Sequence, residues 1–292
     1  MQYLNAHGLL TNLPVVERYF TSHPPPRPGL RLFFQDEHNL VLPGGRDVPR
    51  SCPRGVVPSL FGGGETYLVR VVKEKQARKA DVIVEYNMPN IVNIKSSGRF
   101  PDRFCERIVY CPSIPFPYSN AGDRSIDVMT NIINTAQPRR ASLIEKLEAF
   151  PGYRNVQGVY DLPGLRSLYQ SARILVNAHQ TWHHHSIEEF RVLPALSQGC
   201  LVVSEDVPLR THIPYHEHVI WCRYEDIPDV VADTLRNYDS IFAKLHGTEG
   251  GLPALLASMQ ADFERSMGAV LTADSAKSGL ARFLSTVFRR LG

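Results

Sequence analysis

Short apolar runs alternate along the chain with longer segments in which apolar residues recur every three or four positions. Runs of about four to eight apolar residues favour buried strands, and the longer spacing favours amphipathic helices. In the first part of the chain, the pattern predicts three strands, at residues 30–35, 81–87 and 107–112. It also predicts a helix over residues 65–80, between the first two strands. Strands that alternate with helices are typical of a parallel sheet.

The remainder of the chain continues this alternation more regularly. Strands are predicted at residues 125–133, 155–160, 173–179, 200–205 and 218–224. Helices are predicted at residues 138–150, 162–172, 186–199, 225–238 and 278–291. Pro138 suits the first turn of its helix and Gly199 suits the end of another. This order predicts a doubly wound α/β sheet.

A proline-rich segment, residues 112–124, separates the two series of strands. We therefore expect two Rossmann-like domains, a short one over residues 1–115 and a second over residues 116–275. An amphipathic helix over residues 276–292 follows and is able to cross back to the first domain. Ligands of such folds bind beyond the carboxyl ends of the strands, here in the cleft between the domains.

Composition narrows the class of protein. Of the 292 residues, 43% are hydrophobic, a value that is ordinary for a globular protein. The net charge of +3 is too small to indicate nucleic-acid binding. No apolar run reaches the ~18 residues of a membrane span, and the first residues do not resemble a signal peptide. Five cysteines without C-x-x-C spacing argue against a disulfide framework. We expect a cytoplasmic protein. Whether it contacts a membrane peripherally, and its oligomeric state, are left open.

The densest polar cluster extends from Asn177 to Arg191. Within it, Ser186 and Glu189 fit the S-x-x-E capping box that opens a helix. A helix start also binds phosphate through its free N–H groups, so both interpretations are kept. Residues 183–185 are three consecutive histidines, whose side chains diverge on an extended loop, and we expect no metal site there.

Arg139 and Arg140 stand in the first turn of a predicted helix. A cation at the N-terminus of a helix interacts unfavourably with the helix dipole, which favours anions there. A phosphate held between the two arginines would offset this unfavourable interaction. A solvated pair of arginines is the alternative. The glycines at residues 62–64 lack the G-x-G-x-x-G and P-loop patterns, so a nicotinamide dehydrogenase has little support. The G-x-S-x-G elbow of α/β-hydrolases does not occur.

The segment from Arg173 to Pro208, RILVNAHQTWHHHSIEEFRVLPALSQGCLVVSEDVP, resembles the C-terminal domain of GT-B glycosyltransferases of the family 1 and 4 type. The likeness covers a strand, a loop, an acidic helix start, and the patterns L-x-A-L-x-x-G and V-V-S-x-D. It implies two Rossmann-like domains that face each other across a cleft, with a nucleotide-sugar in the second and an acceptor at the first. Pro194 stands where retaining members have their second glutamate, so the stereochemistry of transfer stays open.

The resemblance, together with the positions after the strands, assigns expected roles. The donor diphosphate would contact Arg139, Arg140, His185, Ser186 and Ile187. The donor nucleoside would contact Glu188, Glu189 and Tyr160. The acceptor would lie near Tyr86, Asn87 and Asn90, for which an Asn-rich turn is the structural alternative. The candidates for the base that activates the acceptor hydroxyl are Asp36, Glu37 and Glu85.

The expected function is metal-independent transfer of a hexosyl or deoxyhexosyl group from a nucleotide-sugar to a glycan or another hydroxyl acceptor, with no cofactor. Two alternatives are kept. An epimerase or hydrolase of nucleotide-sugars would turn over the donor without an acceptor, and a non-catalytic module would bind nucleotide-sugar or glycan and leave it intact.

Overall fold

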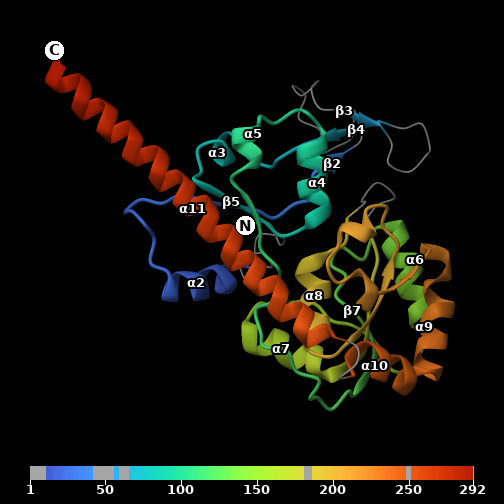
Figure 1. Ribbon diagram of the computed structural model, residues 1–292. Coiled ribbons are helices and arrows are strands. Elements are labelled where there is room, and N and C mark those ends of the chain that lie inside the picture. The colour runs from blue at the N-terminus through green and yellow to red at the C-terminus, as the bar shows by residue number, and fades with distance from the viewer. Residues whose placement is uncertain (1–10, 42–55, 59–65, 181–185, 248–250, 292) are drawn as a thin grey trace.

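A computed structural model describes residues 11–41, 56–58, 66–180, 186–247 and 251–291, with the side chains of the last helix described up to Ala273. Two parallel sheets with helices on their faces make up most of this part of the chain (Figure 1), so the expected α/β class is confirmed.

The first sheet has three parallel strands in the order β1–β5–β6: Leu32–Gln35, Val82–Glu85 and Ile108–Tyr110. Its central strand is buried on both faces, because Val82 and Val84 point to one side and Ile83 to the other. One face is covered by α2 and α11, and the opposite face by three short helices. The bounds are α2 (Leu13–Ser22), α3 (Glu74–Ala77), α4 (Met88–Ser96), α5 (Asp102–Cys105) and α11 (Leu252–Leu291).

The helix expected over residues 65–80 is wrong. Thr66–Val69 is strand β4 of a small antiparallel sheet, between β2 (Leu40–Val41) and β3 (Val56–Pro58). Only the short α3 is helical in the expected range, and it begins after Lys73, whose φ of 52° interrupts a continuous helix. The apolar residues of this segment suit both periodicities, and pairing with two distant strands decides between them.

Three helices of this unit were not expected from the pattern. Helix α2 lies near the N-terminus, α4 takes the place of the Asn-rich turn after β5, and the short α5 precedes β6. Asn87 is the N-cap of α4 and Pro89 lies in its first turn, where a missing N–H costs nothing. The turn interpretation of Asn87 and Asn90 is therefore corrected to a helix start.

The second sheet has five parallel strands in the order β11–β10–β9–β7–β8. Helices α7 and α8 pack on one face, and α6, α9 and α10 on the other. The elements are β7 (Ile126–Thr130), α6 (Pro138–Leu147), β8 (Tyr153–Asn155), α7 (Leu162–Ser171), β9 (Ala172–Asn177), α8 (Glu189–Ser197), β10 (Leu201–Glu205), β11 (Ile220–Cys222), α9 (Ile227–Arg236) and α10 (Tyr238–His246), with three short 3₁₀ turns at Arg210–His212, His216–His218 and Tyr224–Asp226.

Most of the expected elements are present here, but the strand expected over residues 155–160 is wrong. Strand β8 ends at Asn155, and the next five residues have no regular structure. Tyr153 pairs with Val128 of β7, and its hydroxyl lies 2.8 Å from the hydroxyl of Thr130. These contacts start the strand two residues earlier than the local apolar pattern indicates.

Residues 112–124 form no helix or strand, as expected. The segment is fixed at its end by Arg124, whose guanidinium donates to the carbonyl oxygens of Tyr169, Ala172 and Gln198. Gly199 follows α8 with a φ of 77°, and a Cβ there would meet the guanidinium of Arg124. A glycine is required at this position for both reasons.

Helix α11 is longer than the helix expected at residues 278–291, because it begins at Leu252. Its first turns, with Leu252 and Leu256, pack in the core of the second unit, while Phe263 and Met267 pack against the three-stranded sheet. One helix therefore joins both units and then continues past the three-stranded sheet (Figure 1).

Candidate functional site

The carboxyl ends of the two parallel sheets meet where β5 and β6 approach the start of α8. Asn87, just after β5, donates from Nδ2 to the carbonyl oxygen of Ile187 at 2.7 Å. A second contact joins the same elements, because the ring of Tyr86 stacks on the ring of Phe190 with 4.0 Å between the ring centroids. Ligand sites of parallel α/β folds lie at such edges, so this junction is the candidate site.

Glu85 ends β5 inside the junction and is fully buried. One carboxyl oxygen accepts hydrogen bonds from the backbone N–H groups of Tyr86 and Asn87 and from Nδ2 of Asn90, at 3.1, 3.2 and 2.9 Å. Its other oxygen has no partner among the described residues. Burial, with a smaller contribution from Glu189, raises the pKa of Glu85 well above the usual carboxyl value.

Asp36 and Glu37 follow β1 at the same edge and are half-buried. The carbonyl oxygen of Glu37 accepts hydrogen bonds from Gln35 and Asn90, which ties this loop to β1 and α4. Burial raises the pKa of Asp36. The two carboxyl groups are thus less enclosed than that of Glu85, and the assignment of a base remains a prediction.

Glu189 does not close a capping box, so that interpretation is wrong. Helix α8 begins at Glu189 with Glu188 as its N-cap, and no side chain caps it. The Glu189 carboxyl accepts instead from the hydroxyls of Tyr110 and Tyr215, at 2.9 and 3.2 Å, and from the backbone N–H of Ser113 at 3.2 Å. Because Tyr110 ends β6 and Tyr215 belongs to the second unit, Glu189 joins the two units.

Replacing Glu189 with glutamine is expected to reduce the pH dependence of stability. Burial raises the pKa of Glu189 to about 8. A carboxyl group whose pKa is raised in the folded state contributes its full stabilisation at pH values below its ordinary pKa of 4.5. This stabilisation is lost as the pH rises through about 8. The wild type should therefore lose at least about 1 kcal/mol more than the variant between about pH 5 and pH 8.5 in urea unfolding.

The exposed Glu145 supplies the control for this experiment, because Glu145→Gln should leave the pH dependence as in the wild type. Parallel stability curves for the wild type and Glu189→Gln would show that the carboxyl is ionised throughout this range, contrary to the expectation.

A charged cluster lies at the start of α8 beside the first turn of α6. Glu188 is half-buried, and its enclosed Oε1 has no partner among the described residues. The nearby guanidinium groups of Arg140 and Arg191 oppose the rise that burial causes in the pKa of Glu188. Burial, and then the charge of Arg191, lowers the pKa of Arg140 to about 10. The cluster therefore contains two guanidinium groups and one carboxyl group, an excess of positive charge.

Arg139 and Arg140 have different surroundings although they are neighbours. The Arg139 guanidinium forms a buried ion pair with Glu205, donates to the carbonyl oxygen of His179 at 2.7 Å, and lies 3.8 Å from the ring centre of Tyr224. Arg140 donates to the carbonyl oxygen of Ile133, and its Nε has no partner in the described structure. Arg139 therefore supports the second sheet, and Arg140 is the better candidate for an anion.

The other expected residues are more scattered. His185 lies outside the described residues, and Ser186 is partly exposed before α8. Ile187 is buried, and its carbonyl oxygen accepts from Asn87 and from the N–H of Glu189. Tyr160 is 40% exposed in the segment between β8 and α7.

Three residues of the site were given no role from the sequence. Arg191 follows Glu188 by one helical turn, and its Nη1 donates to Asn177 at 3.1 Å, so helical spacing was an available signal. Tyr110 ends β6, a position that commonly faces ligands. Tyr215 lies in an irregular segment, and nothing in its local sequence indicates that it contacts Glu189.

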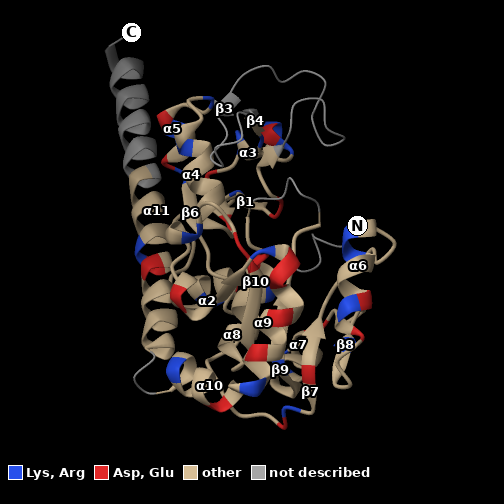
Figure 2. Cartoon of the chain, turned by 90° about the vertical axis from the view of Figure 1, so that its right-hand side faces the viewer, with Lys and Arg blue, Asp and Glu red and all other residues tan. Residues whose placement is uncertain are grey.

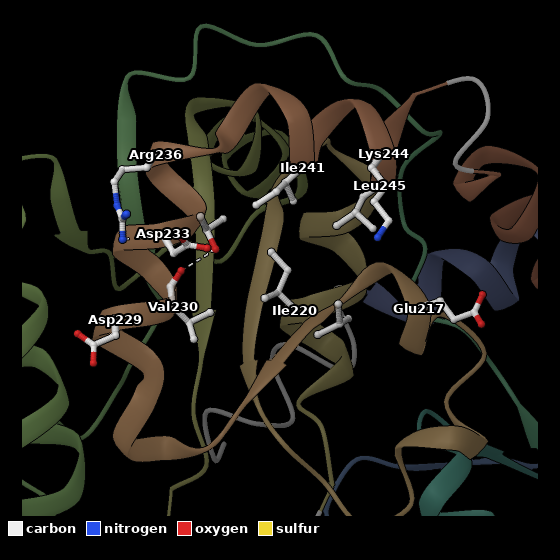
Figure 3. Close-up of a pocket in the computed structure, with 11 residues that line it drawn as sticks. Glu217, Ile220, Asp229, Val230, Asp233, Arg236, Ile241, Lys244 and Leu245 are labelled. Atoms are coloured by element: carbon white, nitrogen blue, oxygen red, sulfur yellow. Dashed lines mark hydrogen bonds and ion pairs between the residues drawn. The ribbon is translucent and has the colours of Figure 1, made fainter.

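A separate hollow of about 610 Å³ lies between β11, α9 and α10 (Figure 3). Val230, Ile220, Ile241 and Leu245 form its apolar floor, and charged residues lie at its rim. Ile220 is the first residue of β11, so this hollow lies away from the carboxyl end of that strand. We therefore place the candidate site at the junction of the sheets and not here.

No protein-family model matches the chain, and no curated protein sequence matches it significantly. The described helices include none that is long and apolar enough to cross a membrane. In the described ranges, no three histidine, cysteine, aspartate or glutamate residues are grouped to hold a metal ion.

Proposed function

We propose that the protein is a GT-B type glycosyltransferase that uses a nucleotide-sugar donor. The observation that carries this proposal is the meeting of two parallel sheets at their carboxyl ends, with the charged cluster of Arg140, Glu188 and Arg191 beside the junction. A pair of facing sheets offers one surface to a donor and one to an acceptor. The resemblance of residues 173–208 to the donor-binding domain of that family supports the same assignment.

The donor diphosphate would bind at Arg140 and the start of α8. During transfer, negative charge develops on the nucleoside diphosphate as it leaves. Preorganised cations and N–H dipoles stabilise that charge. Arg191 would add a second guanidinium, because it lies one turn into the helix and interacts with Arg140 and Glu188. Glu188, whose Oε1 is buried without a partner, would accept hydrogen bonds from the nucleoside.

The acceptor would bind against the loop after β1 and the start of α4. An acceptor hydroxyl needs a base within hydrogen-bond reach. Asp36 fits this role better than Glu85, because its side chain is only half-buried whereas Glu85 is fully buried. Glu85 is enclosed by its own backbone neighbours and Asn90, which suits a positioning role.

The test is donor consumption measured with and without a panel of sugar and alcohol acceptors. The proposal predicts that nucleoside diphosphate is released mainly when an acceptor is present. Equal turnover without acceptor would indicate an epimerase or hydrolase, and binding without any turnover would indicate a non-catalytic module.

Chelation of divalent metals is expected to leave the transfer rate unchanged, because guanidinium groups and N–H dipoles would carry out the charge stabilisation. The measurement is the initial rate with and without EDTA. Complete loss of activity with EDTA, restored by zinc or manganese, would contradict this expectation. It would favour a metal site at the histidines of residues 183–185.

A further inference from the structure

Basic residues gather at the amino-terminal edge of the three-stranded sheet, opposite the candidate site. They stand just before β1, β5 and β6, or at the ends of the helices that lead back to this edge. Figure 2 shows Lys and Arg segments around α3 and α5. We call this group the basic cap; it consists of Arg27, Arg31, Lys75, Arg78, Lys79, Lys95, Arg99, Arg103 and Arg107.

Acidic neighbours do not neutralise the cap. Four acidic residues accompany its nine basic ones, an excess of five positive charges, whereas the whole chain carries only +3. Two of the acids are each shared by two arginines: Asp81 pairs with Arg27 and Arg31, and Glu74 pairs with Arg78 and Arg99. The rest of the chain is therefore net negative, and the molecule has a strong charge asymmetry.

A hollow of about 540 Å³ lies where the cap meets α11. Arg78, Arg103 and Arg107 line it on one side, together with Phe104, and Val270 of α11 lines the other side. The carboxylates of Asp81 and Glu106 also reach its wall. A cationic hollow with apolar residues beside it suits an amphiphilic anion better than a fully polar one.

Helix α11 continues past this hollow to Leu291. Its sequence after Ala273 contains four basic residues and one acidic residue. Apolar residues recur there every three or four positions, from Leu280 to Leu291. A basic amphipathic helix of this kind is typical of segments that lie in the interface of an anionic membrane.

We propose that the basic cap and the adjoining end of α11 form a docking surface for a membrane that contains anionic phospholipids. This inference does not depend on the proposed glycosyltransferase function. Juxtamembrane basic residues attract anionic lipids, and each contributes about a five-fold change in partitioning. Apolar residues beside the cap, and the periodic apolar residues in the sequence of the terminal helix, favour a lipid surface over a nucleic acid.

The test is co-sedimentation of the full chain with vesicles of phosphatidylcholine alone or with about 30% phosphatidylglycerol. The cap variant combines Lys75→Gln, Lys79→Gln and Arg103→Gln, three exposed side chains without an ion pair in the described structure. The matched control combines Lys146→Gln, Arg154→Gln and Lys244→Gln, which are equally exposed on the second unit.

We expect the wild type to bind only the anionic vesicles, with weaker binding at high salt. The cap variant should partition roughly 100-fold less, and the control variant within about two-fold of the wild type. Unchanged thermal unfolding of both variants verifies their folds. The proposal is overturned if the wild type does not bind anionic vesicles or if both variants lose binding equally. It is also overturned if the cap residues are needed only for binding a DNA duplex.

Discussion

Replacing Arg139 with alanine is expected to lower the free energy of unfolding by about 3–5 kcal/mol. Its guanidinium and the Glu205 carboxyl are only 6% and 13% exposed. The substitution removes an ion pair, a hydrogen bond to His179 and the contact with Tyr224 in one step. The enclosed carboxylate of Glu205 would keep a hydrogen bond from the backbone N–H of His179, at 3.0 Å, but would lose its guanidinium partner. Urea unfolding measures the loss.

Arg236→Ala is the control for this prediction, because the ion pair between Arg236 and Asp233 is exposed. Exposed pairs contribute little, so the control should change stability by less than about 1 kcal/mol. A loss below about 1 kcal/mol for Arg139→Ala would contradict the structural role and return Arg139 to the list of diphosphate ligands.

Replacing Arg140 with alanine is expected to weaken binding of a nucleoside diphosphate at least about ten-fold. The free energy of unfolding should change by less than about 1.5 kcal/mol, because only one hydrogen bond, to the Ile133 carbonyl, is lost. Removing a cation from the first turn of α6 offsets part of that loss. Isothermal titration with UDP, GDP, ADP, CMP and TDP gives the affinity.

Lysine at position 140 should recover only part of the affinity, because it offers a point charge where arginine offers a planar fork. The nucleoside without phosphates should bind the wild type and Arg140→Ala alike. If both ligands weaken equally, Arg140 does not contact phosphate, and the electrostatic support for a nucleotide-sugar donor is lost.

The strands and helices of the second unit were predictable because local pattern and tertiary environment agree there. The apolar run that forms β9 is buried on both sheet faces, and Gly199 follows α8 with a positive φ, two residues after the helix ends at Ser197. Thr66–Val69 shows the opposite case, since its apolar residues fit a helix and a strand equally well. Pairing with β2 and β3, which local sequence does not reveal, makes it a strand.

The same distinction applies to the site. The sequence identified the acidic helix start, and it left Glu189 with either a local capping interaction or a contact with the donor nucleoside. Its actual partners Tyr110, Ser113 and Tyr215 lie 79, 76 and 26 positions away. Likewise, two adjacent arginines look equivalent in sequence, and the contacts of Arg139 with Glu205, His179 and Tyr224 separate their roles. Residues whose function depends on distant partners cannot be ranked from spacing alone.

The most direct test of the proposed donor site is thermal unfolding of the wild type and Arg140→Ala with UDP-, GDP-, ADP-, CMP- and TDP-sugars. A ligand at 100 times its dissociation constant adds ~2.7 kcal/mol to the free energy of unfolding. The account predicts that one nucleotide class raises the melting temperature of the wild type by several degrees and that Arg140→Ala loses most of this increase. If every nucleotide-sugar leaves the wild type unchanged, or if both proteins are stabilised equally, the junction beside α8 is not a nucleotide-sugar site.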